Sequence, residues 1–155
     1  MNALPTSCFE FVVAGGTSHE RLSDDWPFAA GAVRRTEAGR AVLLHFAPGR
    51  WLVPDPDADI AARLGAHVDA GVGVLIDVTG KWRGIALSGA DTPRVLAAGV
   101  AVDIVLAARD CAALWLFDCP VILARDGATL DLWVQSSYAP SLMATLESVR
   151  DRIKA

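Results

Sequence analysis

Apolar residues follow two different spacings along the chain after residue 40. Short apolar or alternating runs predict strands over 40–46, 50–53, 72–79, 81–88, 113–117, 121–125 and 129–135. Between them, apolar residues three or four positions apart predict helices that begin near Asp57, near Asp91 and after Ser136 or Ser137 as the capping residue. The predicted order from residue 40 is therefore β-β-α-β-β-α-β-β-β-α.

This order mixes hairpins with helices and lacks strict alternation of strand and helix. It predicts an α+β fold with ferredoxin-like split βαβ units, in which helices pack on one face of a mostly antiparallel sheet. Thr79-Gly80 is predicted to be the turn of a hairpin between 72–79 and 81–88, and Asp126-Gly127 the turn of another.

The length of 155 residues predicts a single domain, 1–155. Within it, 1–39 is expected to be an irregular N-terminal arm, because 14–39 shows no sustained period, and 40–155 the α+β core. The residues expected to be buried in that core are Leu75, Ile76, Val78, Ile85, Leu87, Val95, Leu96, Leu146 and Val149.

Net charge and cysteine spacing argue against two classes of protein, nucleic-acid binders and disulfide-rich domains. A net charge of -4 argues against nucleic-acid binding, which requires a basic surface. Cys8, Cys111 and Cys119 have irregular spacing, which is not typical of a disulfide framework and indicates a reducing compartment. No run approaches the ~20 apolar residues of a membrane span, and we expect a cytoplasmic protein.

Patterns that carry chemistry are sparse. The chain contains neither a glycine-rich dinucleotide loop nor a Walker A sequence, and its three histidines do not have metal-ligand spacing. Asp77 interrupts an apolar strand, where a buried carboxylate would serve as a general base or bind a cationic amine. We favour the other interpretation, that Asp77 accepts hydrogen bonds from the hairpin or pairs with Arg83 or Lys81. We therefore expect no catalytic, cofactor-binding or metal-binding residue in this chain.

The five tryptophans instead suggest binding to a partner, because tryptophan is enriched at interface hot spots. Trp26 and Phe28 form an apolar plug in the polar arm, which either packs on the core of its own domain or anchors a partner. An apolar patch is expected around Trp26, Phe28 and Trp82, whereas Trp115 and Trp133 are expected to face each other inside the molecule. The candidate interface residues are Trp26, Phe28, Arg50, Trp51, Lys81, Trp82 and Arg83.

One segment, 72–104, resembles a known family. Asp77-Val78-Thr79, Ser88-Gly89-Ala90-Asp91, Val95-Leu96 and Asp103 resemble, in order and spacing, the aminomethyltransferases of the glycine cleavage system and their folate-binding relatives. A closer resemblance, over about 40–150, is to the gamma subunit of heterotetrameric sarcosine oxidase. It includes APGRWLV at 47–53, CAALWL at 111–116 and the apolar hairpin of 120–137.

The resemblance implies an accessory, cofactor-free subunit of a flavin- and folate-dependent complex that oxidatively demethylates a secondary N-methyl amine. FAD, FMN, NAD and tetrahydrofolate would then be held by the large partner subunits. The alternative is a stand-alone, homo-oligomeric folate-type binding module, and an unassigned small enzyme ranks last.

Overall fold

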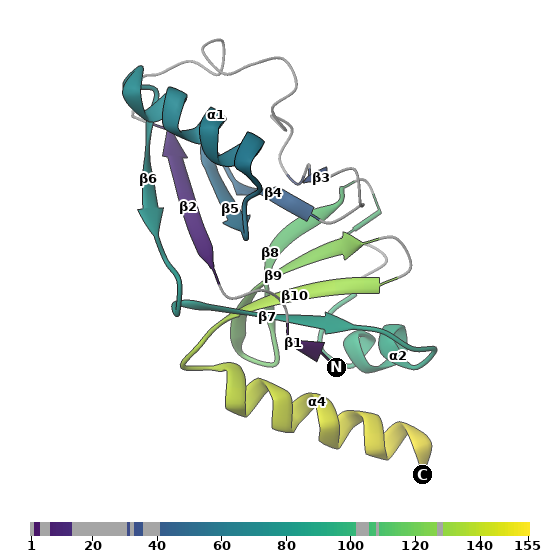
Figure 1. Ribbon diagram of the computed structural model, residues 1–155. Helices are drawn as coiled ribbons and strands as arrows, with labels where there is room; N and C mark the ends of the chain where they lie inside the picture. Colours follow the sequence, from purple (N-terminus) through teal and green to yellow (C-terminus); the bar gives the residue numbers. More distant parts are fainter. Residues whose placement is uncertain are drawn as a thin grey trace. The chain divides into compact units, whose positions relative to one another are not determined.

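The computed structural model describes residues 2–3, 7–13, 31, 33–35, 41–101, 106–107, 109–126 and 129–155, and it confirms the α+β class (Figure 1). The strands are β1 (Asn2–Ala3), β2 (Cys8–Val13), β3 (Val33–Arg35), β4 (Ala41–Ala47), β5 (Arg50–Pro54), β6 (Gly73–Asp77), β7 (Trp82–Leu87), β8 (Cys111–Leu116), β9 (Cys119–Asp126) and β10 (Thr129–Gln135). The described helices are α1 (Ala58–Asp69), α2 (Thr92–Ala97) and α4 (Ala139–Lys154). From β4 onward, this order is the predicted one.

The chain divides into two compact units, Met1–Leu4 with Lys81–Ala155 and Pro5–Gly80. Each unit contains one five-stranded sheet, and every strand pairing within the sheets is antiparallel. The boundary follows Gly80, whose φ of 86° is a conformation that glycine adopts without steric cost. The sequence shows no linker at this point.

The 5–80 unit has the strand order β3-β4-β5-β2-β6, with α1 packed on one face. The carboxylate of Asp57 accepts a hydrogen bond from the Ile60 amide at 2.9 Å, as predicted for the capping residue of this helix. Ile60 and Leu64, one turn apart, then pack against Phe11 and Trp51 of the sheet.

The unit that contains 81–155 has the strand order β1-β7-β10-β9-β8, and α2 and α4 pack on one face of its sheet. Leu96 of α2 and Leu142, Leu146 and Val149 of α4 are buried there, as their helical spacing predicts. Pro140 lies in the first turn of α4 as expected, but the helix begins after Tyr138, and Ser136 does not cap it. The Ser136 amide instead donates to the Lys81 carbonyl at 2.8 Å.

The predicted hairpin between 72–79 and 81–88 is wrong. β6 pairs with β2, with Asp77 opposite Phe9, whereas β7 pairs with β10 and β1 in the other sheet. The Thr79-Gly80 turn therefore leads the chain from one sheet to the next, since β6 and β7 each pair with a strand far away in the sequence.

Two further expectations change with this pairing. Ile76 is 46% exposed, not buried, because it lies on the face of β6 opposite α1, and Leu75 is only partly buried. The region 1–39, expected to be irregular, contributes β1, β2 and β3, and β2 is flanked by strands on both sides. The other core residues predicted from the sequence are buried.

Candidate partner-binding surface

The helix-free face of the 81–155 sheet carries a row of side chains that crosses four strands. Trp82 of β7 lies opposite Gln135 of β10, and Trp115 of β8 lies opposite Pro120 of β9. Since Val134 pairs with Val121, the next residues in register, Gln135 and Pro120, are neighbours too. Trp82 and Trp115 thus stand at the two ends of one cross-strand row.

Trp82 and Trp115, at the two ends of this row, differ in their exposure to solvent. Trp115 is 67% exposed on the edge strand β8, so the expectation that it faces Trp133 inside the molecule is wrong. Trp133 is buried in the adjacent row, opposite Gly84 and Ile122. Trp82 is half-buried, and the Lys81 ammonium lies 5.5 Å from its ring centroid in a cation–π contact.

The remaining predicted interface residues lie in different places. Arg83 is exposed one position along β7, on the other face of the sheet from Trp82. Trp51 is fully buried and stacks on His45 with ring centroids 4.4 Å apart, so its side chain presents no surface to a partner. Trp26 and Phe28 lie outside the described residues, and so does most of the patch expected around them.

Arg50 belongs to the 5–80 unit, where its side chain is partly exposed to solvent and also contacts a buried carboxylate. Its guanidinium lies 2.6 Å from the Glu10 carboxylate, whose side chain is almost fully buried, while the Arg50 side chain is about half exposed. The guanidinium also lies 5.4 Å from the Phe46 ring centroid. These contacts hold Arg50 against its own sheet and leave part of it accessible to solvent.

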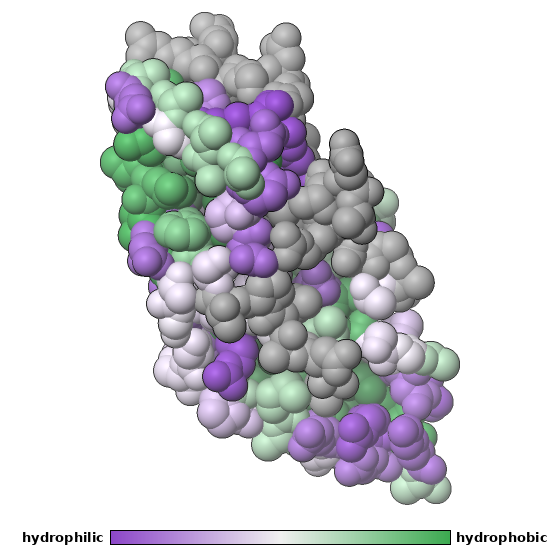
Figure 2. Space-filling view, viewed as in Figure 1, coloured by the Kyte–Doolittle hydropathy of each residue, from purple (hydrophilic) through white to green (hydrophobic). Residues whose placement is uncertain are grey.

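A second exposed apolar group was not among the predicted interface residues. Val68 of α1 and Val74 and Ile76 of β6 are all exposed, at 37%, 53% and 46%. Figure 2 shows strong hydrophobic colour along β6 beside α1. Sequence reasoning missed this group because the supposed pairing with 81–88 placed Ile76 in the core.

Asp77, at the end of β6, fulfils the hydrogen-bonding interpretation. Its carboxylate accepts a 2.8 Å hydrogen bond from the Thr79 amide. Hydrogen bonds from the Thr79 backbone and side chain hold the pKa of this exposed carboxyl below its ordinary value. Asp77 therefore acts as an ionised cap on the turn that ends the strand.

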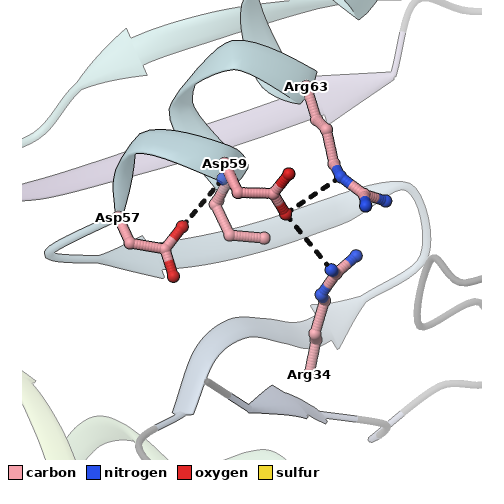
Figure 3. A network of polar contacts seen from close by, with 5 residues as sticks. Arg34, Asp57, Asp59 and Arg63 are labelled. Carbon is pink, nitrogen blue, oxygen red and sulfur yellow. Dashed lines mark hydrogen bonds and ion pairs between the residues drawn. The ribbon is translucent and has the colours of Figure 1, made fainter. Parts of the chain in front are cut away.

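A polar network connects β3 to α1 (Figure 3). The Asp59 carboxylate lies 3.4 Å from the Arg34 guanidinium and 3.1 Å from that of Arg63, one helical turn away. Because Asp59 is 60% exposed, solvent screens these pairs, and each contributes up to about 1 kcal/mol. The network orients the first turn of α1 and is not a binding site by itself.

The described residues offer little for metal or thiol chemistry. They contain no group of three or more histidine, cysteine, aspartate or glutamate side chains that could hold a metal ion. Cys8, Cys111 and Cys119 are buried, and burial raises the pKa of the Cys119 thiol. No helix in the described part of the chain has the length and apolarity needed to cross a membrane.

The described residues of the 81–155 unit line, among others, a small hollow and an open depression. One, of about 200 Å³, lies between the Ser88–Asp91 loop and α4, with Leu96 and Leu146 in its wall and Arg150 and Lys154 among its lining residues. The other, of about 680 Å³, is a depression between α2 and α4 lined by Arg94, Ala97, Ala98, Phe117, Val149, Arg152 and Ile153. The first is smaller than the ~300–1,000 Å³ of ordinary small-molecule sites, and the second is open to solvent.

The arrangement defines an α+β protein with two antiparallel sheets and exposed apolar side chains at the edges of both. Its fold is that of a chain in heterotetrameric sarcosine oxidase from Corynebacterium sp. U-96, solved in complex with pyrrole 2-carboxylate. The TM-score is 0.78 at 18% identity, and the match covers 99% of this chain and 84% of that one. No protein-family model matches the sequence, and no curated protein does so.

Proposed function

We propose that this chain is the small accessory subunit of a sarcosine-oxidase-type complex that oxidatively demethylates a secondary N-methyl amine. The observation that carries the proposal is the likeness of almost the whole chain to one chain of heterotetrameric sarcosine oxidase. The motif order in 72–104 and over 40–150, which resembles the gamma subunit of such enzymes, supports it independently of the fold.

In this proposal the chain holds no cofactor and works in the cytoplasm. FAD, FMN, NAD and tetrahydrofolate bind to larger partner subunits, and the chain contributes by docking to them. The surfaces that support docking are the row from Trp82 to Trp115 and the exposed group of Val68, Val74 and Ile76. Tryptophan anchors and exposed apolar side chains are typical of such interfaces.

Purification from the native cells tests the proposal. The chain, with an affinity tag added after Ala155, should be recovered in fixed stoichiometry with larger subunits that have a flavin absorption spectrum, and the recovered complex should oxidise sarcosine. Expressed alone, the chain should be colourless. Recovery of the native chain without flavin-containing partners would overturn the proposal.

The stand-alone folate-type binding module is the competing assignment. Neither of the two hollows described above favours it, because one is small for a folate-sized ligand and the other is open. Titration of the isolated chain with tetrahydrofolate distinguishes the two assignments. Stoichiometric, saturable binding by the chain alone would favour the module.

A further inference from the structure

In the part of the chain that the structure describes, the outer side of β6 is an open strand edge. In the order β3-β4-β5-β2-β6, β6 ends the sheet, and among the described residues its only strand neighbour is β2. A terminal strand presents backbone N–H and C=O groups that can pair with another strand. Natural edges are commonly protected by charged side chains, proline or a bulge. In β6 (GVLID) the only charged residue, Asp77, lies at the end of the strand, and the register with β2 is continuous.

The hydrogen-bonding pattern identifies the amides on this open edge. The Val78 amide donates to the Cys8 carbonyl at 2.9 Å, in the same register that places Asp77 opposite Phe9. In an antiparallel pair, N–H groups point alternately toward the partner strand and away from it. The amides of Val74 and Ile76 therefore point toward β2, and those of Leu75 and Asp77 point outward.

The side chains specify what an added strand must carry. Val74 and Ile76 are exposed on the face away from α1, so residues beside them on an added strand should be apolar. The exposed Asp77 carboxylate at the strand end favours a lysine or arginine opposite it. Within the sheet, the nearby Glu10 carboxylate already has the Arg50 guanidinium 2.6 Å away.

The length of β6 distinguishes two partners that could pair with its open edge, a second copy of this chain and a strand from a larger subunit. Pairing of two β6 edges would join five residues from each copy, whereas a stable interface uses about 20–30 residues on each side. In the proposed complex, a larger subunit that docks on other surfaces of the chain as well would meet this requirement. A second copy paired through β6 alone does not.

We propose that β6 receives, on its open edge, an antiparallel strand from the larger subunit, with apolar residues beside Val74 and Ile76 and a basic residue beside Asp77. This inference rests on the proposed function, because the larger subunit is the one expected there. The added strand would extend the 5–80 sheet by backbone hydrogen bonds to the Leu75 and Asp77 amides.

Hydrogen exchange of the complex purified through the tagged chain, compared with the isolated chain, tests the pairing directly. The Leu75 and Asp77 amides should exchange at least tenfold more slowly in the complex, while those of Val74 and Ile76 should be protected in both samples. A flavin-containing complex with unprotected Leu75 and Asp77 amides would overturn the strand pairing and leave the proposed function standing. Failure to recover any larger subunit would overturn both the strand pairing and the proposed function.

A matched pair of variants separates the backbone group from the side chain. Leu75→Pro and Leu75→Ala both remove the leucine side chain, but only proline removes the outward N–H, and neither alters an N–H that points toward β2. Leu75→Pro should reduce recovery of the larger subunit at least tenfold relative to Leu75→Ala. Equal recovery from two variants with similar thermal unfolding would contradict the inference.

Charged substitutions provide a second, independent measurement. Ile76→Lys places a charge on the edge, whereas Ala62→Lys places one on α1 at an exposed position outside the proposed docking surfaces. Only Ile76→Lys should weaken recovery of the larger subunit. Sedimentation of the isolated chain adds a further outcome, since a stable dimer with protected Leu75 and Asp77 amides would show that a second copy is the occupant.

Discussion

The guanidinium of Arg50 and the carboxylate of Glu10 form an ion pair 2.6 Å long between β5 and β2, with the carboxylate almost fully buried. Arg50→Ala should lower the free energy of unfolding by about 1–3 kcal/mol, because it removes a cation from a buried acid. In a Glu10→Gln background, the same substitution should cost less than half as much. Urea unfolding of the four proteins gives the coupling energy, and additive effects would show that the two groups do not interact.

The core of the 81–155 unit should be sensitive to truncation on both helices. Leu96 of α2 and Leu146 of α4 are buried at 0% and 2% exposure, and replacing either by alanine should cost about 2–5 kcal/mol through lost burial and the remaining cavity. Val74→Ala, at an exposed position, is the control and should change stability by less than about 0.5 kcal/mol. Wild-type melting of both leucine variants would contradict the assigned helix faces.

Two glycines should respond to alanine with opposite signs. Gly65 lies within α1 with no atom within 4 Å of an added Cβ, so Gly65→Ala should stabilise by about 1 kcal/mol through helix propensity. An added Cβ at Gly73 would lie 2.5 Å from the Val12 carbonyl oxygen and 2.8 Å from the Phe11 ring. Gly73→Ala should therefore destabilise by about 1–3 kcal/mol, as overpacking does. Thermal unfolding of the two variants and the wild type tests whether the two stability changes have opposite signs.

His67 should make the free energy of unfolding depend on pH below neutrality. Burial, and secondarily the charge of Arg63, lower the pKa of His67 from its ordinary value of 6.5. As pH falls below 6.5, the unfolded state takes up this proton first, and stability is lost until the folded state is protonated as well. The free energy of unfolding of the wild type minus that of His67→Gln, both measured by urea unfolding, should therefore decrease from pH 7.5 to pH 5. Parallel curves would show that His67 has the same pKa in both states.

Local sequence patterns were sufficient to predict most helices and strands. They were not sufficient to predict which strands pair when these lie far apart in the sequence. The helix that begins after Asp57 follows from a capping residue and an apolar stripe, both of which act within one or two turns. The residues of β2 that pair with β6 lie 60 to 68 positions earlier, in a segment expected to be irregular, so the Thr79-Gly80 turn suggested a plausible but wrong hairpin. Once that pairing is assigned, the outward faces of Val74 and Ile76 follow from alternation alone.

The interface residues were harder to predict for the same reason. A tryptophan count indicates binding, but it does not say which ring the core covers. Trp51 is enclosed because β5 lies between β4 and β2, whereas Trp115 is exposed because β8 ends its sheet. Strand order, which composition does not encode, determines this difference.

The pairing of Asn2 with Ala86 has a consequence for synthesis on the ribosome. Residues 5–80 can form their sheet and helix while translation continues, but β1 has no partner until β7 has emerged, and that sheet is complete only after β10. The first residues must therefore stay available while the intervening unit is made.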